Sequence, residues 1–366
     1  MPRQAAAFGA RPARAAFAQP FGYDNGLPFS GATQSAPPRT GRAAARFFMR
    51  SLDVDLLREL TRHGPQPVRA LASACAATAA KTERCLAQLA AAGLVVPAAG
   101  GLRLTAPFDF LSADRIRAAL AAPELQIEVV DACPSTNSVL LAGSDQPPAL
   151  LLAEEQTAGR GRRGRRWICG VGAGLTFSLR RRLRRPAREI KGLSLAVGVA
   201  VARALRGLGA AEAALKWPND LLVGGAKLGG ILVETRIQAD AVTAVVGIGV
   251  NCRASPGLEA RLRRRVAALE DFVRPLPSRN LVVTRIVAEV LRALETFDAE
   301  GLAPFRGDWE AMHAHAGQRL RVRLADGRVL AGVADGLCED GGLRLRTRFG
   351  MRAVTSGRVV SSRAAG

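Results

Sequence analysis

The sequence predicts an α+β protein made of three successive folded parts. Residues 51–106 place apolar residues at helical spacing and end in a short hairpin pattern, an outline typical of a winged helix-turn-helix. From Gln126 onward, short apolar runs divided by turns surround two helical stretches, which predicts a mixed sheet. After Gly317, alternating apolar residues and tight turns predict a small β-barrel.

These patterns set the expected domain boundaries. Residues 1–48 are rich in Ala, Arg, Pro, Gly and Ser and show no periodicity, so we expect a disordered N-terminal extension there. The winged helix-turn-helix is expected over residues 49–112 and the central domain over 113–312. The β-barrel is expected over 313–366.

In the N-terminal domain, leucines at helical spacing mark a first helix that ends before Gly64. A second helix begins at Val68 and a third ends at Gly93, and a hairpin then turns at Gly100. In a fold of this outline the third helix, over residues 78–89, would contact DNA.

The charge of that third helix leaves its role open. It offers only Lys81 and Arg84 as cations, and Glu83 offsets them. Two interpretations therefore stand for residues 51–106: operator binding, or a small domain that keeps the fold without a DNA role.

The central domain is expected to carry its sheet on six apolar runs. A hairpin turn is expected at residues 223–226, where two glycines separate apolar residues. The predicted strands are 126–131, 149–154, 175–179, 220–223, 230–235 and 244–250, and the predicted helices are 192–208 and 281–297.

Composition excludes several classes of protein. Hydrophobic content of 48% with 23% charged residues indicates a globular chain, and the apolar stretch 193–208 is interrupted by Arg203 and Arg206 and is too short for a bilayer. The six cysteines are scattered without a CxxC pair, which argues against a zinc site or a disulfide framework. We therefore expect a cytoplasmic protein without a membrane partner.

The formal charge of +21 suggests nucleic-acid binding, but more than half of it is concentrated in one segment. From residue 159 to residue 191, eleven arginines and one lysine face only Glu189, a net charge of +11. We interpret the run 180–185 as a solvated stretch and the remainder as the electrostatics of a site. Any DNA binding must then rest on residues 51–106.

The loop from Gln156 to Trp167 alternates glycine with arginine. Its spacing Gly159-x-Gly161-x-x-Gly164 matches the dinucleotide fingerprint, yet a strand pattern follows it rather than a helix, which excludes that function. An RNA-binding arginine-glycine tail would lack the apolar strands on both sides. The loop is best interpreted as a mobile cover over a nucleotide or an acyl phosphate, disordered when empty.

Lysine is rare in this chain. Only four of the 52 basic residues are lysines, and two of them, Lys216 and Lys227, flank residues 217–220. A lysine opposite an arginine loop can stabilise the charge that develops as a carboxylate and an α-phosphate react. Asp220 is a candidate for contacting a metal or a ligand.

A second polar motif, Ser135-Thr136-Asn137, is expected in a turn after a predicted strand. Two hydroxyls and an amide suit a polar ligand head such as a ureido ring. The same residues are also ordinary turn or helix-cap chemistry, so both interpretations stay open.

Together these motifs resemble the biotin protein ligase family, specifically its two-function type with an N-terminal winged helix. The resemblance covers residues 50–360 in order. It rests on the following segments: 135–137, Gln156 with 159–167, 216–220, Lys227 with 229–234, 247–251, 300–304 and Trp309.

The resemblance implies a central domain of the biotin/lipoate ligase type and a two-step reaction. The biotin carboxylate attacks the α-phosphate of ATP, with Mg²⁺, and a carrier-protein lysine then takes the biotinyl group from biotinyl-5′-AMP. The implied biotin-binding residues are Ser135, Thr136, Asn137, Gln156, Arg160, Gly161, Arg162 and Lys227, of which Arg162 and Lys227 would be catalytic. The implied ATP- and adenylate-binding residues are Arg163, Gly164, Arg165, Trp167, Asn219, Asp220 and Asn251.

The resemblance also implies partners. Mg²⁺ would be held mainly by the ATP phosphates, with Asp220 as the candidate protein ligand. A biotin carboxyl carrier protein would supply the acceptor lysine, residues 51–106 would offer an operator-binding surface, and the chain would form a homodimer. Two alternatives remain: a lipoate or octanoate ligase, and a DNA-binding, biotin-sensing repressor without ligase activity.

Overall fold

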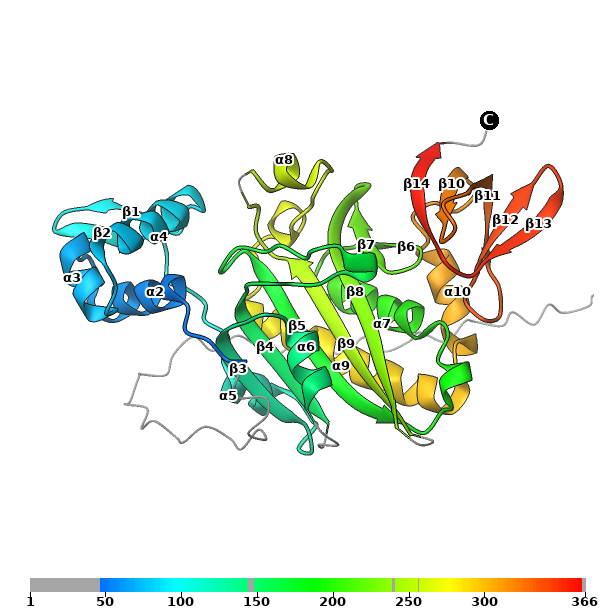
Figure 1. The fold of residues 1–366 in the computed structure, drawn as a ribbon, viewed down its shortest axis with the longest axis horizontal. Coiled ribbons are helices and arrows are strands. Elements are labelled where there is room, and N and C mark those ends of the chain that lie inside the picture. The colour runs from blue at the N-terminus through cyan, green and yellow to red at the C-terminus, as the bar shows by residue number, and fades with distance from the viewer. Residues whose placement is uncertain (1–46, 144–147, 239–240, 256, 364–366) are drawn as a thin grey trace, which may run out of the picture. The chain divides into compact units, whose positions relative to one another are not determined.

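The computed structural model describes residues 47–143, 148–238, 241–255 and 257–363 (Figure 1). The predicted N-terminal extension over 1–48 lies outside the described residues except for Phe47 and Phe48. These two side chains pack against a buried cluster on β3 (Gln126–Cys133) and α6 (Thr136–Ala142). They are part of the fold because their apolar area is buried there, which corrects the expected boundary.

The N-terminal part contains three helices and a hairpin, at the predicted positions. They are α2 (Leu52–His63), α3 (Val68–Ala74), α4 (Ala79–Ala91), β1 (Val95–Ala98) and β2 (Gly101–Leu104). Ser51 caps α2 by accepting a hydrogen bond from Val54 N at 3.4 Å. The leucines at helical spacing, among them Leu56 and Leu57, form a separate buried cluster.

A mixed sheet forms the central part, as predicted, with seven strands rather than the six expected. Its order is β3-β4-β5-β9-β8-β7-β6, and only β3 and β4 are parallel. The other strands are β4 (Ala149–Gln156), β5 (Gly174–Leu183), β6 (Ala214–Lys216), β7 (Asp220–Val223), β8 (Ala226–Gln238) and β9 (Ala241–Asn251).

Different helices pack against the two faces of this sheet. Val246, Ile248 and Val250 of β9 join the main core with α7 (Leu193–Gly207) and α9 (Arg279–Glu300). Val245 points the other way and packs with α6, because alternate strand residues face opposite sides. Figure 1 shows α9 behind the sheet and α6 in front of it. The face beside α6 is where the site lies.

The C-terminal part is a five-stranded antiparallel sheet in the order β13-β12-β11-β10-β14. Leu320, Leu343 and Leu345 are fully buried in it. Trp217 Nε1 donates a hydrogen bond to Gly341 O at 3.1 Å, which joins this sheet to the central part. Its strands are β10 (Arg319–Leu324), β11 (Val329–Leu337), β12 (Leu343–Thr347), β13 (Gly350–Val354) and β14 (Gly357–Arg363).

Several short elements were not predicted, because few residues mark them in the sequence. They are α5 (Ala113–Ala119), α6, α8 (Leu258–Leu262), α10 (Ala303–Ala311), β6, and three short 3₁₀ turns at Arg162–Gly164, Ala187–Glu189 and Leu269–Asp271. Within the described ranges, no helix combines the length and the apolar character that crossing a membrane requires.

The interpretation of residues 180–185 as a solvated run is wrong for two of its arginines. Arg180 is buried on β5, and Arg185 donates to Phe297 O at 3.0 Å and to Ala299 O at 2.9 Å. Arg185 thereby satisfies carbonyls at the end of α9, which a cation stabilises. Arg182 and Arg184 are exposed and fit the expectation, the Arg184 side chain being 87% exposed.

Candidate active site

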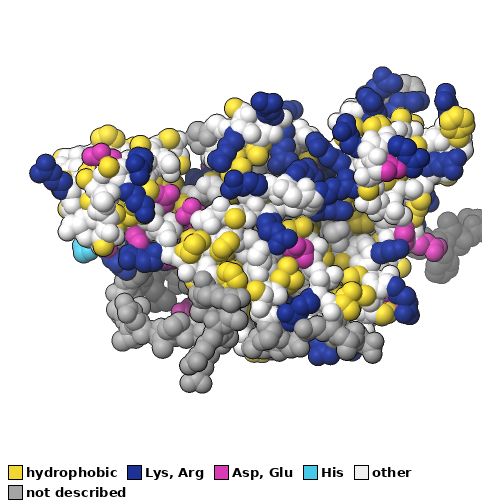
Figure 2. All heavy atoms as spheres, in the orientation of Figure 1, with side chains coloured by type: hydrophobic (Ala, Val, Ile, Leu, Met, Phe, Trp, Pro, Cys, Tyr) yellow, Lys and Arg dark blue, Asp and Glu magenta, His cyan; other side chains and the backbone are white. Residues whose placement is uncertain are grey.

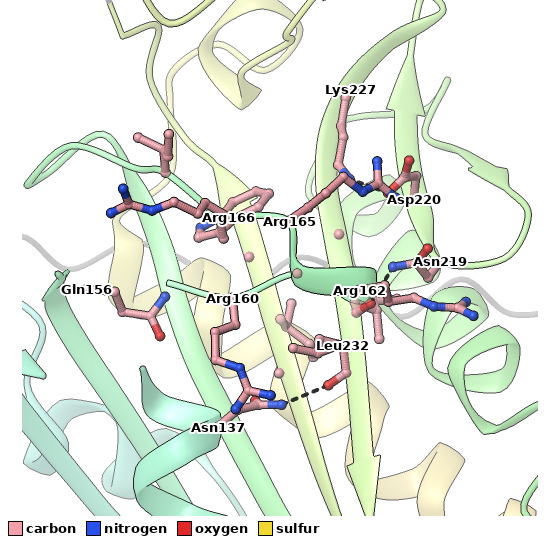
Figure 3. Close-up of a pocket in the computed structure, with 18 of the residues that line it drawn as sticks. Asn137, Gln156, Arg160, Arg162, Arg165, Arg166, Asn219, Asp220, Lys227 and Leu232 are labelled. Carbon is pink, nitrogen blue, oxygen red and sulfur yellow. Dashed lines mark hydrogen bonds and ion pairs between the residues drawn. The ribbon is translucent and has the colours of Figure 1, made fainter. Parts of the chain in front are cut away.

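A cavity of about 320 Å³ opens on the face of the central sheet beside α6 (Figure 3). The start of α6, the end of β4, the arginine-glycine loop, β7, β8 and β9 form its wall, and the segment after α8 and one residue of β14 complete it. Twelve of the predicted site residues line it: Ser135, Thr136, Asn137, Gln156, Arg160, Gly161, Arg162, Arg165, Trp167, Asn219, Asp220 and Lys227.

A continuous hydrogen-bond network holds the polar end of the cavity. Thr136 N donates to Gln156 Oε1 at 2.8 Å, and Thr136 Oγ1 lies 2.6 Å from Ser178 Oγ. Ser178 Oγ donates to Asn137 Oδ1 at 2.6 Å, and Asn137 Nδ2 donates to Leu232 O at 3.1 Å. Buried polar groups that are bonded in this way keep one orientation, so this end is preorganised.

Two side-chain groups at this end have no hydrogen-bond partner in the described part of the chain. Ser135 is the N-cap of α6, yet its side chain makes no capping hydrogen bond. In the described part of the chain, no residue accepts a hydrogen bond from Gln156 Nε2. The motif 135–137 was expected in a turn, and it instead begins a helix, so backbone N–H groups of the first helical turn also face this end.

The floor of the cavity is made of glycine. A Cβ on Gly247 would collide with Asn137 Oδ1 and lie 2.9 Å from Asn137 Cγ. A Cβ on Gly249 would overlap the indole of Trp167. Gly247 and Gly249 are two residues apart on β9, so both face the cavity. Their bare backbone allows the polar network on one side and the loop on the other to approach the sheet.

The arginine-glycine loop folds back on itself over the cavity. Gly161 N donates to Arg165 O at 2.6 Å, and Trp167 N donates to Gly159 O at 2.9 Å. Arg163 adopts a left-handed conformation with φ 56° inside this turn. A strand, β5, follows the loop, in agreement with the exclusion of a dinucleotide-binding fold.

Arg160 fastens this loop to the rest of the site. Its guanidinium donates to Ser138 Oγ at 2.9 Å and forms an ion pair with Glu234. Glu234 also accepts from Asn137 Nδ2 at 2.9 Å. The loop is therefore coupled to the polar network through one carboxylate. That the loop becomes disordered without a ligand stays a prediction.

The opposite end of the cavity is cationic. Lys227 follows the hairpin turn between β7 and β8 and forms an ion pair with Asp220, both side chains being mostly buried. Burial lowers the pKa of Lys227, and Asp220 opposes that shift. Figure 3 shows Arg165 reaching from the loop toward this pair. Burial, with Arg163 and Arg165 nearby, also lowers the pKa of Arg162.

Three predicted residues do not line the cavity. Arg163 turns outward and donates to Ser356 Oγ in the C-terminal sheet at 3.0 Å. Gly164 occupies the turn with φ 70°. Asn251 Nδ2 donates to Ala267 O at 3.0 Å and to Lys227 O at 3.3 Å. Asn251 thus fixes the backbone of Lys227 from behind the site.

The sequence analysis missed several residues that line or hold the cavity. Ser178 joins the polar network, and Arg263, Arg264 and Arg358 add three cations to those of the arginine-glycine loop. The alternating glycines of β9 were the one local signal, because glycine inside a strand marks a close approach. Arg358 has no such signal, since it comes from a strand 131 residues after Lys227.

The donor set does not make a protein-held metal site. In the described ranges, no group of three or more His, Cys, Asp or Glu side chains is placed to bind a metal. Asp220 is the one carboxylate among the lining residues, and Lys227 is paired with it.

Comparison with known proteins identifies the family. A model of the biotin/lipoate A/B protein ligase family matches residues 130–251. The chain is 35% identical over 249 residues to the bifunctional ligase/repressor BirA of Escherichia coli, which covers 67% of this chain and 76% of that protein. The chain belongs to this ligase family.

Two further members of the family are similar over most of their length. The biotin–[acetyl-CoA-carboxylase] ligase of Mycobacterium tuberculosis is 34% identical over 247 residues, covering 65% of this chain and 90% of that ligase. The biotin protein ligase of Aquifex aeolicus, solved in complex with biotin and ATP, is 27% identical with a TM-score of 0.56. The match covers 66% of this chain and 99% of that one.

Proposed function

We propose that this protein is a biotin protein ligase, which joins biotin and ATP into biotinyl-5′-AMP and transfers the biotinyl group to a lysine of a biotin carrier protein. One observation carries the proposal: a single cavity has a hydrogen-bonding end at α6 and a cationic end at Lys227. A ureido ring with a carboxylate on a flexible chain matches that polarity from end to end.

In the first step an oxygen of the biotin carboxylate attacks the α-phosphorus of ATP, and the bond from that phosphorus to pyrophosphate breaks. Both reactants are anionic, so fixed cations must offset their repulsion. Lys227, Arg162 and Arg165 line the end of the cavity where these groups would meet. The ion pair with Asp220 favours the charged form of Lys227 and opposes the lowering of its pKa by burial.

In the second step the neutral amine of the acceptor lysine attacks the acyl carbon of the mixed anhydride. AMP leaves with the bonding electrons, and the amine loses a proton to solvent. The mixed anhydride must be shielded from water until the lysine arrives. We assign this shielding to the loop 157–168, with Trp167 on Gly249 and Arg160 on Glu234 as its two attachments.

We assign Mg²⁺ to the ATP phosphates, where it neutralises their charge. The remaining expected roles follow the cavity wall: Ser135, Thr136, Asn137 and Gln156 for the biotin ring, and Asn219 for the nucleotide end. Asn219 Nδ2 donates to Ile231 O at 2.7 Å, which leaves its side-chain oxygen for the ligand.

Lipoate and octanoate are the nearest alternative substrates. Their ring or chain end offers no hydrogen-bonding head, so binding would leave Ser135 Oγ and Gln156 Nε2 desolvated and unpaired. A site built to hydrogen-bond a substrate rejects an analogue that lacks those groups. The cavity therefore favours biotin.

We further propose that residues 49–112 are a winged helix-turn-helix and that 313–366 form an SH3-like barrel. On α4, Lys81 and Arg84 are exposed and Thr78 is the N-cap. Operator binding is tested by gel shifts on candidate operator DNA, with the protein in the presence and absence of biotin. A ligand-dependent sedimentation coefficient tests the homodimer.

The deciding experiment measures adenylate formation. The protein is incubated with MgATP and either biotin, lipoate or octanoate, and pyrophosphate release is followed. A carrier domain of a biotin-dependent carboxylase is then added and its mass is measured. Of the three acids, we expect only biotin to cause pyrophosphate release from MgATP. We expect the mass of the carrier domain to increase by one biotinyl group. A repressor without ligase activity would bind biotin and release no pyrophosphate.

A further inference from the structure

The mouth of the cavity holds more arginine than its anionic ligands need. Arg165, Arg166, Arg263, Arg264 and Arg358 line the cavity, and Arg261 and Arg265 flank it on either side of the segment after α8; we call these seven residues the mouth arginines. Within the described part of the chain, none of them forms an ion pair with a carboxylate. Figure 2 shows Lys and Arg side chains gathered over α8 and toward β14.

The charge balance changes between the two half-reactions. MgATP and biotin together bring about three negative charges to the cavity. After pyrophosphate leaves, the adenylate retains one phosphate charge. Of the lining residues, only Asp220 is acidic, and Lys227 already neutralises it. The seven mouth arginines therefore have the largest surplus of positive charge at the moment when the acceptor protein must approach.

An acceptor lysine carries its own positive charge in solution, so this mouth repels it unless its surroundings are acidic. Like-charge contacts across an interface cost several kcal/mol, and opposite charges speed association. Resting on the function proposed above, we propose that the mouth arginines form a docking surface for an acidic face around the acceptor lysine of the carrier domain.

A protein fits this surface better than a nucleic acid does. Five of the mouth arginines line the cavity that the acceptor amine must enter to reach the adenylate. A polynucleotide bound across them would block that opening and offer no amine. An acidic carrier face instead neutralises the arginines and brings the lysine to the opening in the same event.

The test separates docking from chemistry with Arg261→Glu/Arg265→Glu. Both side chains are exposed and neither lines the cavity, so we expect adenylate formation and discharge to a small nucleophile to be unchanged in this variant. The matched control is Arg285→Glu, an exposed arginine on α9 across the sheet. Three rates are measured: pyrophosphate release from biotin and MgATP, discharge of the adenylate by hydroxylamine, and biotinylation of a carboxylase carrier domain.

We expect the double variant to keep the first two rates and to lose about tenfold or more in kcat/KM for the carrier domain. Wild-type transfer to the carrier should slow as salt rises, while discharge by hydroxylamine should not. Replacing the carrier's acidic residues near its lysine by Asn and Gln should reproduce the loss.

Each contrary outcome has its own meaning. Unchanged kcat/KM in the double variant, with no salt dependence, overturns the docking proposal while leaving the ligase function standing. No pyrophosphate release by the wild type overturns the ligase function itself. Loss of random-sequence DNA or RNA binding in the double variant, with normal transfer to the carrier, would assign the mouth arginines to nucleic acid instead.

Discussion

Replacing Gly247 with alanine tests the polar end of the site through a single methyl group. The new Cβ would collide with Asn137 Oδ1, so the Asn137 side chain must move. That movement breaks its bonds to Ser178, Leu232 and Glu234, which measure 2.6, 3.1 and 2.9 Å.

The magnitude follows from those three hydrogen bonds. At about 1 kcal/mol each, their loss amounts to about 3 kcal/mol, divided between unfolding and biotin binding. If half of that amount falls on the complex, the Kd for biotin rises about tenfold. We expect a rise of at least this size, because the displaced amide also intrudes into the cavity.

Titration calorimetry measures the loss in biotin affinity, and unfolding in urea measures the loss in the free energy of unfolding. The control is Gly307→Ala on α10, where a Cβ meets nothing within 4 Å. It should leave biotin binding unchanged and stabilise the helix slightly. A Gly247→Ala protein that binds biotin within twofold of wild type, with unchanged stability, would refute the assignment of Asn137.

Three other predictions concern charge. Lys227→Ala should slow pyrophosphate release at least ~100-fold, and a near-normal rate measured by a coupled phosphate assay would remove its catalytic role. Glu154→Gln breaks the ion pair between Glu154 and Arg279, whose two side chains are 1% and 7% exposed respectively. It should lower the free energy of unfolding by about 3 kcal/mol. A loss under 1 kcal/mol, measured by unfolding in urea, would contradict this. Burial lowers the pKa of His313 and His315 from 6.5 to about 4, so the unfolded chain binds more protons in that window and stability should fall as pH drops through it. Urea unfolding at pH 7 and pH 4.5 checks the fall, and His313→Gln/His315→Gln should flatten it.

Much of the fold could be predicted because it depends on local patterns. The periodicity of residues 192–208 predicts α7, and the Gly224-Gly225 turn predicts the β7–β8 hairpin. The short elements α5, α10 and β6 were missed. β6, for example, is three residues long, and Leu215 N reaches Met312 O at 2.7 Å, a partner about a hundred residues away.

The residues of the site also fall into two groups, those that a local sequence pattern marks and those that it does not. Contiguous motifs such as Gln156 with its loop, or Lys227 after its turn, carry their chemistry in neighbouring residues. Ser178 and Arg358 do not, because each reaches the cavity only through the pairing of distant strands. Solvation of the run 180–185 was misjudged for a related reason: the carbonyls that hold Arg185 belong to α9.

The glycine floor also sets the direction in which this enzyme can be redesigned. A pocket is usually enlarged for a bulkier substrate analogue by shortening a side chain that touches it. Gly247 and Gly249 have no side chain to shorten, and every substitution there adds atoms against Asn137 or Trp167. An enlarged, analogue-selective ligase must therefore gain its space from the loop or from other lining side chains such as Leu232, and the floor can only be used to exclude ligands.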